Sequence, residues 1–420
     1  MAKAQSEPSV PAPQDHIFGQ FPLWLVVLVA LTVGSTVLPY AYQALTTPEG
    51  QFFPGTTNPN IYDHNTYFAW ANQVRDGKLL AHNLNAVEQH PPMLPNLPWV
   101  VMGLAARATG IPTVYLYHAM RMISGVIYLL LVYGIARQIR SDEAFLKIAM
   151  IFVALGTGLG GFAVLVQKDF VPAELWIPEM WAYSSIMSHP HFVLALVGAA
   201  ATVLAVLYGL HNGGWWIGAM AFGGSLLMTH VHPFTAVIVL AALVLFLPLV
   251  IMRGLRWDPI IWAGVGAIPP IALLGYYYMT NSFAQAWAAN TVLMTPALKN
   301  TLVGLGILAP LAVAGAVMVL RKDHARSSGL LMIIWMVLGI IGLYSLPASF
   351  QRRCFEGLHL PLAMLGAICI ADAVIPRCAE RMKARSEAVG DATVIVAVLL
   401  VVTFVPTHIA YISRQLDSTN

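Results

Sequence analysis

Residues 232–251 read HPFTAVIVLAALVLFLPLVI, a run of 20 positions without a Lys, Arg, Asp or Glu. A helix of that length crosses the hydrocarbon core of a bilayer, which is about 30 Å thick, because each residue adds about 1.5 Å. The whole chain has the same character, with 58% hydrophobic and 10% charged residues in a length of 420. Soluble domains carry roughly 25% charged residues. Lipid must therefore be the main solvent of this chain.

Ten further apolar runs have a similar length, which predicts an all-α, polytopic integral membrane protein with about eleven transmembrane helices. A twelfth apolar stretch, 93–108, is interrupted by Pro95 and Pro98. We expect this stretch to be re-entrant or interfacial rather than a span. The predicted spans lie near 22–43, 114–136, 146–166, 190–210, 215–230, 232–251, 259–279, 300–320, 329–346, 358–375 and 392–412.

The domain organisation follows from these runs. The apolar stretch Leu23–Tyr42 is too long for a signal-peptide core and lacks a small-residue cleavage site, so it is expected to be an uncleaved first helix. The predicted parts are a disordered cytoplasmic tail (1–21), a single transmembrane domain (22–412) whose first outer loop (46–113) carries amphipathic and re-entrant segments, and a short outer tail (413–420).

Basic residues predict the orientation in the cell membrane, because cytoplasmic loops are enriched in Lys and Arg. With a cytoplasmic N-terminus and an extracytoplasmic C-terminus, 13 of the 22 Lys and Arg residues face the cytoplasm. These residues are Lys3, Arg137, Arg140, Lys147, Arg253, Arg256, Arg321, Lys322, Arg326, Arg377, Arg381, Lys383 and Arg385.

This orientation places a set of polar residues together on the outer side, at helix ends or in loops. A polar set on one face of the membrane predicts a functional site at the outer interface. The set contains Asp63, His64, His90, Glu174, Glu179, His189, His191, His230, His232, Arg352, Arg353 and Glu356.

Asp63 begins an amphipathic segment in the first outer loop. Tyr67, Trp70 and Val74 recur at helical spacing after it, and Gly77 is a suitable C-cap. The positive end of a helix dipole favours an ionised carboxylate, so Asp63 is a candidate general base. The alternative is that Asp63 only caps the helix.

Five histidines are candidates for the same site. His90 precedes a proline-rich turn and is either a site residue or a solvated loop residue. The other four form two similar strings, Ser188-His-Pro-His-Phe192 and Thr229-His-Val-His-Pro-Phe234. His189, His191, His230 and His232 would contact an anion or hydroxyl, play structural roles, or bind a divalent metal. On a helix the two rings of an HxH string point about 200° apart, so a metal requires an extended backbone.

Two arginine sites complete the candidates. Arg352 and Arg353 suit a lipid phosphate, which guanidinium groups bind through two parallel hydrogen bonds. Their alternatives are a membrane-surface anchor or an ion pair with Glu356. Arg121 lies inside a predicted span, one turn after His118, where a buried charge marks either function or a paired structural site.

The outer loop 167–188 contains Trp176, Trp181 and Tyr183. These aromatic side chains either stack on a sugar ring or belong to the aromatic belt at the membrane surface.

Four motifs resemble those of the GT-C membrane glycosyltransferases. Asp63-His64-Asn65-Thr66-Tyr67 resembles the acidic start of the family's first outer loop, and His90-Pro91-Pro92-Met93-Leu94 resembles its "KPP-L" element with His in place of Lys. Arg121 resembles an arginine common in the following span. Arg352-Arg353, followed by Gly357 and Leu360-Pro361-Leu362, is similar to a late outer arginine motif. The chain departs from the family in having no DxD pair and no soluble C-terminal domain.

The resemblance implies a GT-C fold, similar to that of bacterial members, and a membrane glycosyltransferase. Such an enzyme moves a hexose or pentose, with inversion, from a polyprenyl-phosphate-linked donor to an acceptor at the outer face of the membrane. Asp63 would be the base, and Arg352 and Arg353 would bind the phosphate. The expected partners are the lipid-linked donor and membrane lipid, without nucleic acid. No cofactor is certain, and a divalent metal is possible. Other substrate-binding candidates are His64, His90, Arg121, His189, His191, His230 and His232.

Two other functions fit the composition. A secondary transporter would place its site near the midplane on broken helices, often within repeats. A non-catalytic membrane assembly protein would need no site at all.

Overall fold

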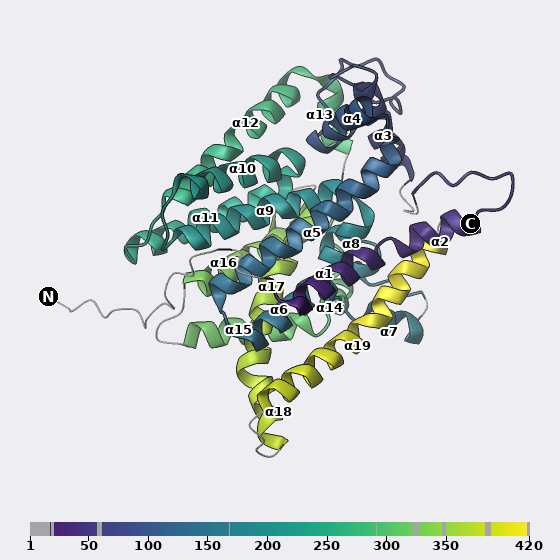
Figure 1. The fold of residues 1–420 in the computed structure, drawn as a ribbon. Coiled ribbons are helices and arrows are strands. Elements are labelled where there is room, and N and C mark those ends of the chain that lie inside the picture. Colours follow the sequence, from purple (N-terminus) through teal and green to yellow (C-terminus); the bar gives the residue numbers. More distant parts are fainter. Residues whose placement is uncertain are drawn as a thin grey trace.

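A computed structural model describes residues 17, 21–56, 61–167, 169–290, 292–321, 327–346, 350–382 and 388–417. Throughout these residues the fold is helical, and the only β pairing is an isolated bridge between Ala81 and Met93. The protein is therefore an all-α, multi-pass membrane protein, as predicted (Figure 1). The basic residues Lys3, Lys322, Arg326, Lys383 and Arg385 lie outside the described residues, as do residues 1–16, 18–20 and 418–420 of the two predicted tails.

Eight helices in the described part are long and apolar enough to cross a membrane, or up to ten when two bent pairs are counted. The bent pairs are α6 with α7, at 52°, and α14 with α15, at 76°. The eight spans are α1–α2 (Leu23–Thr46), α5 (Thr113–Ile139), α9 (Pro190–Gly209), α11 (Pro233–Met252), α12 (Asp258–Thr280), α16 (Ser327–Ser345), η3 to α18 (Gln351–Arg381) and α19 (Val389–Leu416).

Every predicted span coincides with one of these helices, a bent pair, or α10. Helix α10 (Trp215–Val231) has only 17 residues, and it packs between α9 and α12. The bent pairs join α6 (Glu143–Leu155) to α7 (Gly160–Val166) and α14 (Leu298–Leu305) to α15 (Leu308–Arg321). The predicted runs, about eleven in number, thus correspond to eight long helices, two pairs that break at glycines and the short helix α10.

The long first loop carries two helices, as predicted. Helix α3 (Ile61–Arg75) is the amphipathic segment, and Gly77 follows it with a φ of 96°. Helix α4 (Leu97–Thr109) occupies the 93–108 stretch and has 13 residues, about 20 Å, which is too short to span a bilayer. It packs on α3 and α5, so this stretch is a short helix lying against the bundle.

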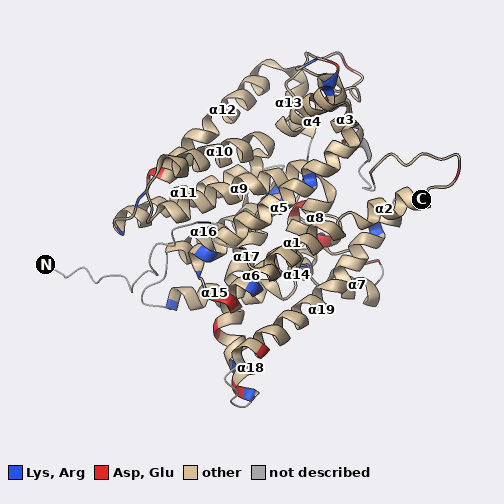
Figure 2. Ribbon diagram, in the orientation of Figure 1, with Lys and Arg blue, Asp and Glu red and all other residues tan. Residues whose placement is uncertain are grey.

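The two ends of the bundle differ in their charges. The start of α1 lies beside the end of α5, where Arg137 donates to the carbonyl of Ile17. The end of α19 lies at the opposite end, where Tyr411 contacts Ser188. Figure 2 shows the described arginines of the predicted cytoplasmic loops at the α5, α11, α15 and α18 ends, where Arg140 pairs with Asp142 and Asp372.

Arg121 is fully buried in α5 and is held by protein groups. Its guanidinium donates to the hydroxyl of Thr36 at 2.9 Å, to the carbonyl of Thr36 at 3.3 Å and to the carbonyl of Ile186 at 3.1 Å. Thr36 lies at the break between α1 (Leu23–Ser35) and α2 (Leu38–Thr46), where the helix leaves carbonyls without partners. Arg121 therefore connects this break to α8 (Ala182–Ser188).

Glu174 lies where the two bent pairs meet. Its Oε1 accepts from the backbone N–H of Gly160 at 2.6 Å, and Leu159 donates to the carbonyl of Val303 at 3.0 Å. A Cβ at Gly304 would lie 2.6 Å from the other carboxylate oxygen of Glu174. The backbone of α14 therefore approaches the carboxylate closely, and burial raises the pKa of Glu174 to about 7.

We expect this carboxyl to make stability depend on pH. Because the pKa of Glu174 is raised in the folded protein, the contribution of this carboxyl to the free energy of unfolding is full below the unfolded pKa near 4.5. That contribution is lost as pH rises through 7. The loss amounts to roughly 3 kcal/mol. Between pH 5 and pH 8 the melting temperature of the wild type should fall relative to that of Glu174→Gln. Parallel melting curves for the two proteins would contradict this. Glu143→Gln, at an exposed carboxylate, is the control.

Candidate functional site

Five segments that are distant in the sequence meet at one end of the bundle. They are α3, the loop before α8, the first turns of α9 and α11, and the 3₁₀ helix η3 (Gln351–Phe355) with Glu356. Helices α9 and α11 both begin with a His-Pro pair, in which the histidine is the N-cap and the proline follows at N1. Proline at N1 is favourable because its fixed φ suits the helix and it needs no hydrogen-bond donor. The repeated histidine strings thus mark the starts of two neighbouring helices.

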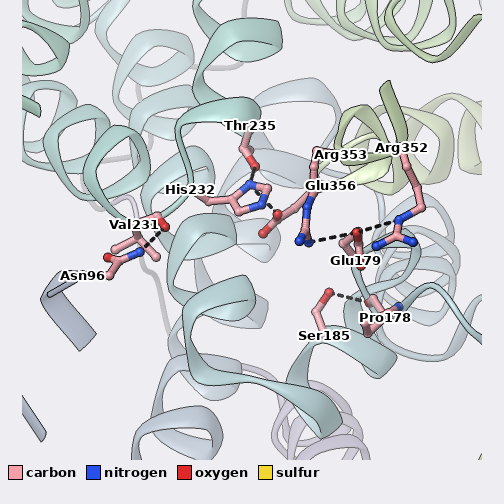
Figure 3. Close-up of polar contacts among 10 residues, drawn as sticks. All are labelled: Asn96, Pro178, Glu179, Ser185, Val231, His232, Thr235, Arg352, Arg353 and Glu356. Atoms are coloured by element: carbon pink, nitrogen blue, oxygen red, sulfur yellow. Dashed lines mark hydrogen bonds and ion pairs between the residues drawn. The ribbon is translucent and has the colours of Figure 1, made fainter. Parts of the chain in front are cut away.

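The arginine pair is held by a buried carboxylate (Figure 3). An oxygen of Glu179, in the 3₁₀ helix η2 (Pro178–Met180), lies 3.0 Å from a terminal nitrogen of Arg353 and 3.4 Å from Nε of Arg352. The side chain of Glu179 is 1% exposed. Burial raises the pKa of Glu179, but Arg353 and Arg352 outweigh burial and hold this pKa below its usual value. The carboxylate is therefore ionised.

Aromatic rings line the arginine pair. The Arg352 guanidinium carbon lies 5.4 Å from the ring centre of Trp176, and that of Arg353 lies 5.5 Å from the ring centre of Phe192. Such contacts favour a cation that is shielded from water. They also fix the guanidinium planes, which leaves further N–H groups of the two side chains to hold a second anion.

Asp63 belongs to the same electrostatic environment. It is the third residue of α3 and lies in its first turn, rather than at the N-cap position. Burial raises the pKa of Asp63 above its ordinary value, although Arg353 and Arg352 act to lower it. One turn later, the ring of Tyr67 lies 5.2 Å from that of His191 and 5.8 Å from that of His189. Helix α3 thus brings the carboxylate to the histidine and arginine side chains.

Tyr117 of α5 fixes two histidines beside Asp63. Its hydroxyl donates to the carbonyl of Ser188 at 2.6 Å, and it contacts Nε2 of His64 at 3.1 Å and Nδ1 of His189 at 2.8 Å. A carbonyl only accepts, so the single phenolic proton is used there. Both histidines must then donate to the phenolic oxygen, which sets the tautomer of each ring.

His232 is held by a different group. Its Nδ1 lies 2.7 Å from Glu356 and 2.8 Å from the hydroxyl of Thr235 (Figure 3). Glu356 therefore pairs with this histidine, and the predicted partner of the arginines is replaced by Glu179. The ring of Phe192 lies 5.9 Å from that of His232 and 5.5 Å from the guanidinium carbon of Arg353.

Three of the candidates lie away from this cluster. His90 stacks on Phe283 of α13 (Ser282–Asn290) at 4.3 Å and bonds to loop backbone. His230 accepts from the backbone N–H of Leu97 and so helps to position α4. Arg121 connects the α1–α2 break to α8, as described above. The geometry gives all three a structural partner.

Of the three candidate aromatic residues between 167 and 188, two lie away from the cluster and one belongs to it. Trp181 and Tyr183 are buried and contact His359 and His408, at 4.4 and 4.2 Å between ring centres. These two side chains are neither a sugar platform nor a surface belt. Trp176, which is 41% exposed, is the one that reaches the arginines.

The histidines do not fit the metal hypothesis. Within the described residues, no three His, Cys, Asp or Glu side chains are arranged to hold a metal ion. His189 and His232 instead form hydrogen bonds with Tyr117 and Thr235. Elemental analysis of purified protein, compared with a variant that lacks both histidines, would test the metal hypothesis directly.

Sequence reasoning placed Glu179 in the outer polar set without a partner, used Tyr67 only as part of the amphipathic helix and its motif, and assigned no role to Tyr117 or Thr235. Glu179 carried a signal, since it is a carboxylate between Trp176 and Trp181 in a predicted outer loop. Nothing in the sequence marks Tyr117, because tyrosine is ordinary in a membrane helix and its role depends on three tertiary contacts.

No protein-family model matches the chain, and no curated protein sequence matches it. Among solved structures, the chain is similar to the oligosaccharyltransferase of the archaeon Archaeoglobus fulgidus. In complex with an inhibitory peptide and a dolichol-phosphate, that protein gives a TM-score of 0.57 at 11% identity, over 94% of this chain and 56% of that chain. Tethered to an acceptor peptide, it gives 0.54 at 12% identity, over 95% and 56%.

The chain has the GT-C fold. It spans a little over half the length of the archaeal protein. Because sequence identity is low, the likeness concerns the arrangement of the helices. Within this GT-C fold, the cluster of Asp63, Glu179, Arg352 and Arg353 lies at one end of the bundle, at the starts of α3, α9 and α11.

Proposed function

We propose that this protein is a membrane glycosyltransferase that moves a sugar from a polyprenyl-phosphate-linked donor to an acceptor at the outer face of the membrane. One observation carries the proposal: a partly buried carboxylate, Asp63, shares an electrostatic environment with the paired arginines Arg352 and Arg353. A base and a phosphate site in one place are the two elements that transfer from a sugar phosphate requires.

The fold supports the lipid part of the proposal. The archaeal structure of the same fold was solved with a dolichol-phosphate and an inhibitory peptide. A bundle of membrane-length helices gives a polyprenyl chain an apolar environment, while the arginines lie at helix ends where a headgroup phosphate would lie. A transporter reading is weaker, because the charged cluster lies at helix ends rather than near the midplane.

The chemistry assigns each group a step. The ionised Asp63 carboxylate takes the proton of an acceptor hydroxyl, whose oxygen attacks the anomeric carbon from the face opposite the phosphate. The bond from the anomeric carbon to the phosphate oxygen breaks, and the phosphate keeps the electron pair. Arg352 and Arg353 stabilise the negative charge of the leaving phosphate. The sugar is transferred with inversion, as a hexose or pentose.

Glu179 gives the arginines a fixed position before the donor arrives. A guanidinium has five N–H donors, so Arg353 can keep its bond to Glu179 and still hold a phosphate oxygen. An arginine held in this way loses less side-chain entropy on binding. The carboxylate is therefore a positioning group for the phosphate site.

The test uses purified protein in nanodiscs. Undecaprenyl phosphate is the binding probe, and undecaprenyl phosphate linked to radiolabelled glucose, mannose or arabinose is the donor panel, with isolated membranes supplying the acceptor. We expect the wild type to bind the lipid phosphate and to release it from at least one labelled donor. Wild-type protein that neither binds undecaprenyl phosphate nor releases it from any donor would contradict the proposal.

The proposed orientation makes a separate prediction. In a protein without its native cysteines, an impermeant thiol reagent applied to intact cells should modify cysteine at 87 or 290 and spare cysteine at 141 or 321. All four positions are described, and Val87 is 97% exposed. Residue 180 is unsuitable as a probe because Met180 is buried, and residues 60 and 323 lie outside the described residues. Modification at 321 but not at 290 would reverse the orientation.

A further inference from the structure

A second polar group lies beside the arginine pair and takes no part in the chemistry above. Nδ1 of His232, the N-cap of α11, is 2.7 Å from Oε2 of Glu356. The two residues are 5% and 1% exposed, so both are almost completely buried. Glu356 lies three residues after Arg353, at the end of η3, so the pair is joined directly to the phosphate site.

The contact places the Glu356 carboxylate beside the imidazole. The hydrogen bond of Nδ1 is with the hydroxyl of Thr235 at 2.8 Å. Among the described residues, neither Nε2 of His232 nor either carboxylate oxygen of Glu356 has a hydrogen-bond partner.

The two carboxylate oxygens are buried acceptors without donors, and each costs about 1–3 kcal/mol when it is left unsatisfied. The ligand that would satisfy them must supply hydrogen-bond donors. The phosphodiester of a lipid-linked donor offers only acceptor oxygens, so it does not suit this pair. Hydroxyl groups do suit it, because they donate to a carboxylate and either donate to or accept from an imidazole nitrogen.

The position agrees with that chemistry. The ring of Phe192 lies 5.5 Å from the guanidinium carbon of Arg353 and 5.9 Å from the ring of His232. Phe192 therefore lies near both Arg353 and His232, and the pair adjoins the proposed phosphate site. A sugar whose phosphate is held by Arg353 would lie close to these residues.

We propose that His232 and Glu356 recognise hydroxyl groups of the sugar carried by the lipid donor. The carboxylate oxygens of Glu356 accept from the sugar hydroxyls, and Nε2 of His232 forms a further hydrogen bond with the sugar. The inference rests on the proposed function and names the part of the donor that this pair binds. His232 is thus a specificity residue, and Thr235 supports the same nitrogen.

The test separates sugar from phosphate. The affinity of each protein is measured for undecaprenyl phosphate and for undecaprenyl phosphate-linked glucose, mannose and arabinose in nanodiscs. In His232→Phe, the affinity for the preferred sugar-linked donor should fall by roughly 10- to 100-fold. The affinity for bare undecaprenyl phosphate should change little. Glu356→Gln should show part of the same loss. Thr229→Val, a buried change one turn earlier in α10, is the folding control.

A second measurement does not depend on the variants folding. Monodeoxy donors are compared with the parent donor on the wild type, where removal of the recognised hydroxyl should cost a similar factor. An equal loss of both lipids in His232→Phe, or full affinity for every monodeoxy donor, would overturn the inference and leave the proposed function standing. A wild type that fails to bind undecaprenyl phosphate would overturn both.

Discussion

Replacing Asp63 with asparagine is expected to slow sugar transfer by roughly 10²–10⁴-fold, because an amide cannot take the proton of the acceptor hydroxyl. Asparagine has nearly the same size, so folding and binding of undecaprenyl phosphate should change little. If Asp63 only places a charge in the first turn of α3, its loss costs about 0.3–1 kcal/mol of stability and leaves turnover intact. The measurement is the rate of lipid phosphate release, compared with the melting temperature.

Asp76 provides the matched control for this experiment. It lies just after the end of α3, its side chain is 60% exposed, and it pairs with Arg75 at 3.0 Å. Asp76→Asn should therefore keep wild-type turnover. Near-normal turnover of Asp63→Asn would exclude it as the base. A rate loss with an unchanged melting temperature would support catalysis.

The second large effect is expected from Arg353. Arg353→Gln removes a phosphate ligand, and charge-assisted hydrogen bonds of this kind are worth about 1.5–3 kcal/mol. Binding of undecaprenyl phosphate should weaken by roughly 10- to 100-fold. The same change leaves Glu179 buried beside Arg352 alone, at 3.4 Å. Breaking a buried ion pair in this way typically costs about 3–5 kcal/mol, so the melting temperature should also fall.

A double variant separates these two effects. In Arg353→Gln with Glu179→Gln, no carboxylate is left buried without its main partner, and stability should largely return. Lipid phosphate affinity should stay low, because the ligand is still missing. Recovery of both properties together would mean that Arg353 acts only through the fold and would remove it from the phosphate site.

The sequence predicted the spans because an apolar run between charged loops is a local property. It did not predict the bends, since those depend on contacts between distant helices. A Cβ at Gly158 would lie 2.2 Å from the carbonyl oxygen of Gly304, so the breaks in α6–α7 and α14–α15 require each other. The short helix α10 was marked by its glycines, but its packing between α9 and α12 was not.

The sequence predicted where the site lies better than it predicted which side chains pair within it. Positive charge in the loops placed the histidines, Asp63 and the arginines at one end, and the structure brings most of them together. The partner of the arginines could not be inferred, because sequence distance favours Glu356, three residues after Arg353, while Glu179 is 174 residues away. Only the path of the loop before α8 makes Glu179 the ligand and leaves Glu356 to His232.

The hydroxyl of Tyr117 has one proton and two lone pairs, and its three neighbours use all of them. His64 and His189 therefore cannot exchange their tautomers without first breaking a hydrogen bond to this oxygen. The imidazole protons of these two histidines therefore stay on defined nitrogens. Nitrogen-15 chemical shifts of the two rings should accordingly each report a single species, and Tyr117→Phe would allow mixtures. A tyrosine in α5 thus sets the tautomers of two histidines in the candidate site.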